Sequence, residues 1–380
     1  MKFVAEALHL SPPAAKRLEE RNLLREAFVK HSFFHDIVSA YKLEKKFGGF
    51  EEGTLIAKTK HGLEVVRGYP KIRRALTLHP TIKKHFRDEV VVEEKMNGYN
   101  VRIVNFGSNL YAITRRGFIC PYTTEKAREM IDSSFFRHYP ELMLCCEVVG
   151  KESPFVVKDI YGTDLDFYIF DVREKRSNRS LSIDNKMKIA EEYGFKLAPI
   201  LERCDTNVAH EVCRDIIERI GNEGREGIVL KDPEMKINPI KYTTSESNAT
   251  DLYFAFRYFN DYGKDFMLSR LVREAFQSFE FNENESKFKE RCERIGKAIL
   301  ESMIKSVIDV SCGREVSEHH RLRFSSLEVL ELFKVHLIRM GVDVRFSDPY
   351  HDGEKYVLEF RRIMRSTTDK ISHHLKGNLW

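Results

Sequence analysis

The sequence predicts an α+β fold with a core of antiparallel or mixed sheets, a small N-terminal domain and helical C-terminal domains. Between about residues 75 and 245, short β-branched and aromatic runs alternate with turns and a few helical patterns. Past residue 246 the strand signals nearly vanish, and apolar residues recur at helical spacing. We therefore predict an N-terminal domain (1–65), a central domain (66–245), a helical domain (246–313) and a C-terminal domain (314–380).

Composition limits the class of protein without identifying its partner. The 63 Lys and Arg outnumber the 58 Asp and Glu by five, which permits a basic groove for nucleic acid but does not demand one. The seven cysteines form no CxxC pair and no zinc spacing. No stretch approaches the apolar length of a membrane span. We expect a cytoplasmic protein with buried free thiols and no membrane partner.

The first 65 residues are predicted to be mostly helical. Ser11-Pro12 forms an N-cap and first-turn pair that opens a helical pattern continuing to Phe28. A second helix is expected to end near Phe47, before two glycines. A hairpin should follow at 55–66, and the basic run 67–74 then suits a phosphate backbone, although a solvated linker explains its charge more simply.

Lys95 is the residue around which the central domain is organised. It ends the β-branched run 90–94, and Asn97-Gly98 breaks that pattern before Val101 resumes it, which predicts strand, tight turn and strand. An amine there, beside a glycine that lets a ligand approach the backbone, suits a phosphate contact or a covalent nucleophile. Taken alone, the motif is too short to exclude a solvated lysine at a hairpin turn.

Later strand-like segments also end in residues that suit nucleotide chemistry. Arginine after a strand offers a guanidinium fork for ribose or phosphate oxygens. Each such residue has a simpler alternative as a turn residue, a strand-edge charge, a core phenylalanine or a solvated lysine. Helical patterns at 183–193 and 208–220 separate these strands, and each is predicted to end at a glycine. The residues concerned are Arg116, Glu147, Phe170, Glu226, Lys231 and Lys241.

As an ordered set these residues resemble the covalent nucleotidyltransferase superfamily of polynucleotide ligases and mRNA capping enzymes. Asn100, at the fifth position after the lysine, is similar to RNA ligases, whereas DNA ligases and capping enzymes usually carry arginine there. Over the whole chain, including the run 67–72, the sequence resembles the archaeal homodimeric ATP-dependent RNA ligases. The matching order is Lys95-x-Asn97-Gly98, Arg116-Gly117, Glu147, Phe170-Asp171, Glu226-Gly227-x-x-x-Lys231 and Lys241.

The resemblance implies a nucleotidyltransferase core, the ATP-grasp-like adenylation domain of ligases. AMP would move from ATP to Lys95 and then to the 5′-phosphate of an RNA, and a 3′-hydroxyl would displace it to join or circularise RNA. Lys231 and Lys241, together with Mg²⁺ or Mn²⁺, would favour the neutral amine of Lys95 and neutralise phosphate charge. Glu226 is the first choice as metal ligand and Glu147 the second.

The same resemblance assigns the ATP-binding residues. Glu93 is expected at the adenine amino group, Phe170 on the adenine ring, and Arg116 and Glu147 at the ribose. Asn100 would serve RNA adenylation and end joining more than the first step. The three lysines, Lys95, Lys231 and Lys241, complete the implied ATP-binding set and are its implied catalytic residues.

The helical segment 246–313 is predicted to form a homodimer interface. Its aromatic run at 253–259 and its apolar stripe offer more apolar surface than so short a segment easily buries against itself. Docking on the central domain is the alternative. The stripe consists of Phe288, Cys292, Ile295, Ile299 and Met303.

Three rival functions remain open at this stage. A DNA ligase would use the same chemistry, but Asn100 disfavours it. An RNA-capping guanylyltransferase would need a C-terminal β-barrel, which the helical pattern at 265–310 contradicts. A non-catalytic RNA-binding protein would not need the intact lysines. No P-loop signature supports a kinase or ATPase.

Overall fold

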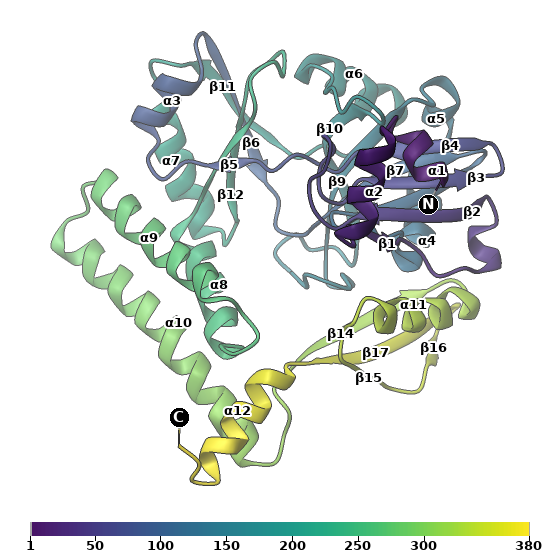
Figure 1. Cartoon of the computed structure of the whole chain (residues 1–380). Coiled ribbons are helices and arrows are strands. Elements are labelled where there is room, and N and C mark those ends of the chain that lie inside the picture. Colours follow the sequence, from purple (N-terminus) through teal and green to yellow (C-terminus); the bar gives the residue numbers. More distant parts are fainter. Residues whose placement is uncertain (1, 380) are drawn as a thin grey trace.

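The computed structural model describes residues 2–379, whose strands form four sheets (Figure 1). The chain begins with helices α1 (Lys2–Ala7) and α2 (Pro12–Glu20). A four-stranded sheet follows in the order β1-β2-β3-β4. Its strands are β1 (Leu24–Glu26), β2 (Ile37–Leu43), β3 (Leu55–Thr59) and β4 (Gly62–Val66), with a 3₁₀ turn at Ser32–Phe34.

The predicted helical character of the N-terminal segment is therefore wrong beyond Glu20. The expected second helix is strand β2, whose buried residues pair in antiparallel register with β3. A short apolar run is compatible with helix or strand, and pairing with a distant partner decided between them here. The hairpin at 55–66 is confirmed as β3 and β4.

Two further sheets form the centre of the molecule. One has the order β10-β9-β7-β8 and shares a core with the N-terminal sheet, in which Phe34 and Tyr111 lie 6.1 Å apart between ring centroids. The other has the order β11-β6-β12-β13-β5 and is covered by α3 (His79–His85) and α7 (Ala209–Asn222). The strands of the first sheet are β7 (Tyr99–Phe106), β8 (Asn109–Thr114), β9 (Leu142–Val149) and β10 (Asp166–Glu174). Those of the second are β5 (Arg73–Arg74), β6 (Glu89–Lys95), β11 (Ile200–Asp205), β12 (Gly227–Lys231) and β13 (Ile240–Thr243).

The turn after Lys95 connects these two sheets. β6 ends at Lys95 as predicted, but β7 pairs with β8 and β9 and not with β6, so the expected hairpin is wrong. A Cβ atom on Gly98 would lie 2.1 Å from the carbonyl oxygen of Val148, so only glycine fits where the chain crosses. Lys95 therefore stands where the chain passes from one sheet to the other.

Helices cover the outer sides of this central region. α4 (Pro121–Met130) and α5 (Ser134–His138) follow β8, and α6 (Ile183–Tyr193) follows β10. The predicted end of α6 is confirmed, because Gly194 has a left-handed φ of 66°. The predicted end of the next helix is two residues short, since α7 continues through Gly221 to Asn222.

The segment after β13 is helical, as predicted. It contains α8 (Ser245–Arg257), α9 (Lys264–Glu280) and α10 (Glu285–Ser311). Figure 1 shows α9 and α10 as two long green helices joined by a short turn, and Gln277 of α9 donates a hydrogen bond to the Thr243 carbonyl of β13. None of the helices in the described part of the chain combines the length and apolar character needed to cross a membrane.

The C-terminal segment is mixed rather than helical. It contains the helix α11 (Leu327–Arg339) and a sheet of four strands, which are β14 (Ser317–Phe324), β15 (Val344–Phe346), β16 (Tyr350–Asp352) and β17 (Lys355–Ile363). This sheet and α11 pack on α4, with the Phe324 and Tyr122 ring centroids 4.9 Å apart. The last helix, α12 (Arg365–Leu375), lies against α10 (Figure 1).

Candidate active site

The five-stranded sheet has one apolar face and one charged face. Side chains alternate along a strand, so Glu93 and Lys95 of β6 share a face that Val92 does not. In the register of the sheet, Val229 lies opposite both Glu93 and Lys241, which places Lys231 and Lys241 on the same face as Lys95. The other face packs on α3 and α7. The charged side chains predicted from separate motifs thus lie together because of strand pairing.

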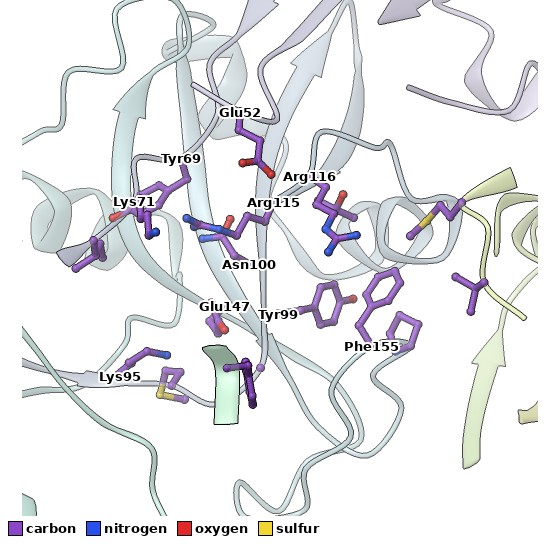
Figure 2. A pocket seen from close by; sticks show the side chains of 18 of the residues that line it. Glu52, Tyr69, Lys71, Lys95, Tyr99, Asn100, Arg115, Arg116, Glu147 and Phe155 are labelled. Carbon is purple, nitrogen blue, oxygen red and sulfur yellow. The ribbon is translucent and has the colours of Figure 1, made fainter. Parts of the chain in front are cut away.

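This charged face lines a cavity of about 1350 Å³ that reaches from the sheet to the C-terminal segment. All eight predicted ATP-binding residues line it: Glu93, Lys95, Asn100, Arg116, Glu147, Phe170, Lys231 and Lys241. In Figure 2, Lys95 and Glu147 point toward one another, and Asn100, Arg115 and Arg116 lie farther along the same cavity.

Lys95 forms an ion pair with Glu226. Its Nζ lies 2.6 Å from Glu226 Oε2, and both side chains are about one-fifth exposed. Glu226 immediately precedes β12, whose first residue, Gly227, is the register partner of Lys95. The predicted nucleophile and the predicted metal ligand are therefore in direct contact.

Glu147 is the second carboxylate beside Lys95. It lies on β9 opposite Asn100 of β7. Burial raises the pKa of Glu147 to about 7, with the nearby Glu226 carboxylate acting in the same direction and Lys95 opposing it. Near neutral pH this carboxyl group is poised between its protonated and ionised forms.

Replacement of Glu147 tests this buried charge through stability. The carboxyl has its ordinary pKa of 4.5 in the unfolded chain and a pKa of about 7 in the folded protein. Its buried charge therefore lowers the free energy of unfolding only above pH 4.5, and by the full amount above about pH 7. We expect Glu147→Gln to raise the free energy of unfolding by up to about 3 kcal/mol at pH 8 and not at pH 4. Urea denaturation without ATP or metal measures this, and equal stability of variant and parent at pH 8 would contradict it.

Lys231 and Glu93 belong to a buried charge network at the end of the cavity. Lys231 Nζ donates to Glu93 Oε1 at 2.6 Å, to Asp171 Oδ1 at 3.0 Å and to the Phe170 carbonyl at 2.6 Å. Lys186 of α6 pairs with the other oxygen of Glu93. Burial opposes the charge on Lys231, but Asp171 and Glu93 outweigh it and raise the pKa of its ammonium. The ammonium of Lys231 therefore stays charged although it is buried.

Phe170 occupies a β-bulge in β10. The register with β9 shifts between Ile169 and Asp171, which leaves Phe170 outside the regular pairing. Its ring lines the cavity and meets the Tyr69 ring edge-on, with centroids 5.1 Å apart. Its carbonyl, freed from the ladder, accepts hydrogen bonds from Lys186 and Lys231. The bulge thus gives the ring a position that a core phenylalanine on a regular strand would not have.

The remaining predicted residues have distinct environments. Lys241 is half-buried, and burial together with the charges of Arg74 and Lys95 lowers its pKa to about 8. Arg116 is exposed in the turn after β8. Asn100 Oδ1 is buried and has no hydrogen-bond partner within residues 2–379. An unpaired buried acceptor beside the cavity is available to a donor from a ligand.

Sequence analysis missed two residues that shape this site. Lys186 lies among the buried residues Ile183, Ile189 and Ala190 of α6, where an apolar side chain would be expected. A lysine within the apolar stripe of a predicted helix was therefore the sequence feature that could have identified Lys186 as a site residue. Tyr69 donates a hydrogen bond from its hydroxyl to Asp171 Oδ2 at 2.6 Å, and no local pattern distinguished it.

The residues around Lys95 fit a divalent cation that also binds substrate phosphates. Within residues 2–379, no group of three or more His, Cys, Asp or Glu side chains could hold a metal ion by itself. Glu226 is nevertheless close enough to Glu147 for its charge to raise the pKa of that carboxyl. Mg²⁺ is usually held by one or two carboxylates together with phosphates and water, which matches this pair.

Two apposed sheets, a lysine where the chain crosses between them and lysines at strand ends define the nucleotidyltransferase class of ligases. A family model described as RNA ligase matches residues 88–243, and one described as the C-terminal region of ligase Pab1020 matches residues 254–378. The solved structure of an archaeal ATP-dependent RNA ligase is 38% identical, with a TM-score of 0.92, over 100% of this chain and 99% of that chain.

Two further relatives extend the comparison. The uncharacterized protein MJ0414 of Methanocaldococcus jannaschii is 40% identical over 99% of this chain and 96% of its own length. A putative ATP-dependent DNA ligase from Aquifex aeolicus is 25% identical, with a TM-score of 0.89, over 97% of this chain and 100% of that chain. The chain belongs to the archaeal ATP-dependent RNA ligase family, and its enzymatic class is that of an ATP-dependent RNA ligase.

Proposed function

We propose that the protein seals RNA ends through an AMP group carried covalently on Lys95. The position of Lys95, at the crossing between two sheets, inside the cavity with Lys241 and in an ion pair with Glu226, is the observation that supports this. Attack of Nζ on the α-phosphorus of ATP forms lysyl-AMP and expels pyrophosphate. The 5′-phosphate of an RNA then takes the AMP, and a 3′-hydroxyl displaces it to form a phosphodiester.

The charged residues would share the work of the first step. Glu226 and Glu147 would hold Mg²⁺ or Mn²⁺, which would neutralise phosphate charge when bound. If Glu226 turned to the cation, its ion pair with Lys95 would be lost, which favours the neutral amine that attacks. Lys241 would face the phosphates, and Lys231, bonded to Phe170 and Glu93, would keep the nucleoside end of the cavity in place.

For the nucleoside we propose that adenine lies on Phe170. Glu93 would then be near its amino group, with Arg116 and Glu147 near the ribose. Asn100, with its unpaired Oδ1, would act in RNA adenylation and end joining. Base stacking on an aromatic ring requires no hydrogen bond and is strong in such pockets.

Phe170→Ala tests the stacking role. We expect a loss of about 1 to 3 kcal/mol in ATP use, measured as kcat/KM for lysyl-AMP formation, because the base loses its aromatic surface. The thermal melting temperature should fall much less, since the ring is only partly buried. A large drop in melting temperature with unchanged ATP use would assign Phe170 to the core instead.

Incubation with α-labelled ATP or GTP and Mg²⁺, followed by denaturing electrophoresis, tests the proposed function. Covalent label from ATP and not from GTP is the expected result. Label from GTP would indicate a capping enzyme, and label from neither would favour a non-catalytic RNA-binding protein. Matched RNA and DNA substrates with a 5′-phosphate and a 3′-hydroxyl then separate an RNA ligase from a DNA ligase.

We also propose that the protein is a homodimer joined through α9 and α10. The aromatic run at 253–259 packs largely within the chain, so it is not the exposed surface that sequence analysis expected. Exposed apolar residues instead repeat along both long helices, and Phe279 is 84% exposed. They are Leu268, Val272, Phe276 and Phe279 of α9 and Phe288, Leu300, Ile304, Val307 and Ile308 of α10.

Light scattering at micromolar concentration should give twice the 44.5 kDa chain mass. Ile304→Glu should shift the population toward the monomer, because a charge would be buried in the interface. Val208→Glu, at an exposed apolar residue outside α9 and α10, should leave the mass unchanged. A parent protein with the mass of one chain would refute the dimer without affecting the chemistry at Lys95.

For the four segments we propose distinct tasks. Residues 66–245 would carry out adenylation, 246–313 dimerisation, and 1–65 and 314–380 would flank the cavity and the RNA. All seven cysteines are free thiols, and Cys145 and Cys146 are buried, which suits a reducing compartment such as the cytoplasm.

A further inference from the structure

Two arginines beside the adenylation cavity lack an anionic partner. Arg74 of β5 is the register partner of Lys241 in β13, and its guanidinium donates to Thr243 Oγ1 at 2.9 Å. Arg273 of α9 donates to Asn248 Oδ1 at 3.4 Å. Neither arginine forms an ion pair with a carboxylate of residues 2–379. Each is only partly exposed, so each has lost part of its hydration without a compensating charge.

A hydrogen-bond chain fixes the two arginines relative to one another. Thr243 donates from Oγ1 to Asn248 Oδ1 at 3.2 Å, so the partner of Arg74 is bonded to the partner of Arg273. Asn248 is oriented in turn by its amide, which donates to Glu274 Oε1 at 2.7 Å. Glu274 is held by Arg291 of α10. The two guanidinium groups are thus positioned from both the sheet and the helical segment.

The local charges are unbalanced in favour of cations. Burial, with the charges of Arg74 and Arg270, lowers the pKa of Arg273 to about 9. The two carboxylates whose charges oppose this shift are already engaged, since Glu226 pairs with Lys95 and Asp251 pairs with Arg270. An anion placed between the two arginines would relieve this repulsion. Guanidinium forks bind phosphate oxygens in pairs, which makes phosphate the natural anion.

We infer that Arg74 and Arg273 form a binding site for a phosphate of the RNA strand, next to the cavity that takes the nucleotide. Neither residue lines the 1350 Å³ cavity in which the proposed ATP ligands lie, which favours an RNA phosphate over the triphosphate of ATP. Because Lys241 lies beside Arg74, a strand held here would pass close to Lys95. This inference rests on the proposed RNA ligase chemistry.

The test compares Arg74→Gln and Arg273→Gln with Arg179→Gln. Arg179 is 76% exposed in the segment between β10 and α6, where it pairs with Glu174, so its variant controls for the loss of one positive charge. Fluorescence anisotropy measures binding of a 5′-phosphorylated RNA oligonucleotide at several salt concentrations. Labelled ATP, supplied below saturation, measures lysyl-AMP formation in the same preparations. Thermal melting checks that each variant folds. If a Gln variant does not fold, Arg273→Lys replaces it, because lysine keeps the positive charge but lacks the forked guanidinium group.

We expect both Gln variants to bind RNA about 10-fold or more weakly than the control. The slope of log affinity against log salt should decrease by about 0.7 for each lost phosphate contact. An equal loss of lysyl-AMP formation and RNA binding would assign the arginines to the triphosphate of ATP and overturn the inference. RNA binding equal to the control would overturn it as well. A parent protein that forms no lysyl-AMP would instead refute the proposed function.

Discussion

Lys95→Ala is expected to abolish lysyl-AMP formation and to leave sealing of pre-adenylated RNA substantially intact. The first step needs the Nζ nucleophile, and its removal should reduce the rate by at least ~10³-fold. The last step needs only a 3′-hydroxyl and the AMP already on the RNA, for which the cavity and Lys241 remain. Label transfer from α-labelled ATP measures the first activity, and ligation of a pre-adenylated oligonucleotide measures the last.

A matched variant controls for loss of a positive charge. Lys60 is an exposed turn residue between β3 and β4, so Lys60→Ala should retain both activities. Equal loss of both activities in a folded Lys95→Ala protein would count against the nucleophile assignment. Persistence of the covalent adduct in that protein would place the nucleophile elsewhere.

Lys231→Met is expected to have the largest effect on stability. The substitution leaves Glu93 and Asp171 buried with one fewer cation, and breaking such a buried network costs about 3 to 5 kcal/mol. Burial opposes ionisation of Asp171, but Lys231, two further cations and the Tyr69 hydrogen bond together outweigh it and keep the pKa of this carboxyl below its ordinary value. The ionised Asp171 carboxylate therefore stabilises the fold above pH 3.8, its ordinary pKa. This stabilisation is lost as the pH falls through the lower pKa that Asp171 has in the folded protein.

Urea denaturation of the parent and the variant at pH 8 and pH 5 measures this effect. Without Lys231 the pKa of Asp171 should rise, so the variant can take up a proton on this carboxyl, and its deficit should be smaller at pH 5. Lys16→Met is a suitable control, because Lys16 is 76% exposed and its partner Glu20 is 58% exposed, so their ion pair is largely solvated. A deficit no larger than that of the control would show that the buried network does not stabilise the fold.

Local patterns predicted those parts of the site that depend on alternation along a strand. The β-branched run before Lys95 predicted β6, and the apolar run 227–230 predicted β12 with Lys231 at its end. The end of α6 was equally local, because Gly194 takes a left-handed conformation that few other residues adopt.

Features that depend on distant partners could not be predicted in this way. The turn at Asn97-Gly98 has the composition of a hairpin, yet its strands enter different sheets because β6 pairs with β11 and β12. β2 was mistaken for a helix for the same reason. Lys186 joins the site only because α6 packs over the bulge at Phe170, an arrangement invisible in its own segment.

Peptide mass spectrometry of the protein after incubation with ATP and Mg²⁺ tests the central claim most directly. The account predicts one adenylyl group, found on the peptide that contains Lys95 and released by acid as expected for a phosphoramidate. An adenylyl group on any other residue, or an unmodified Lys95 peptide in protein that ligates RNA, would contradict it.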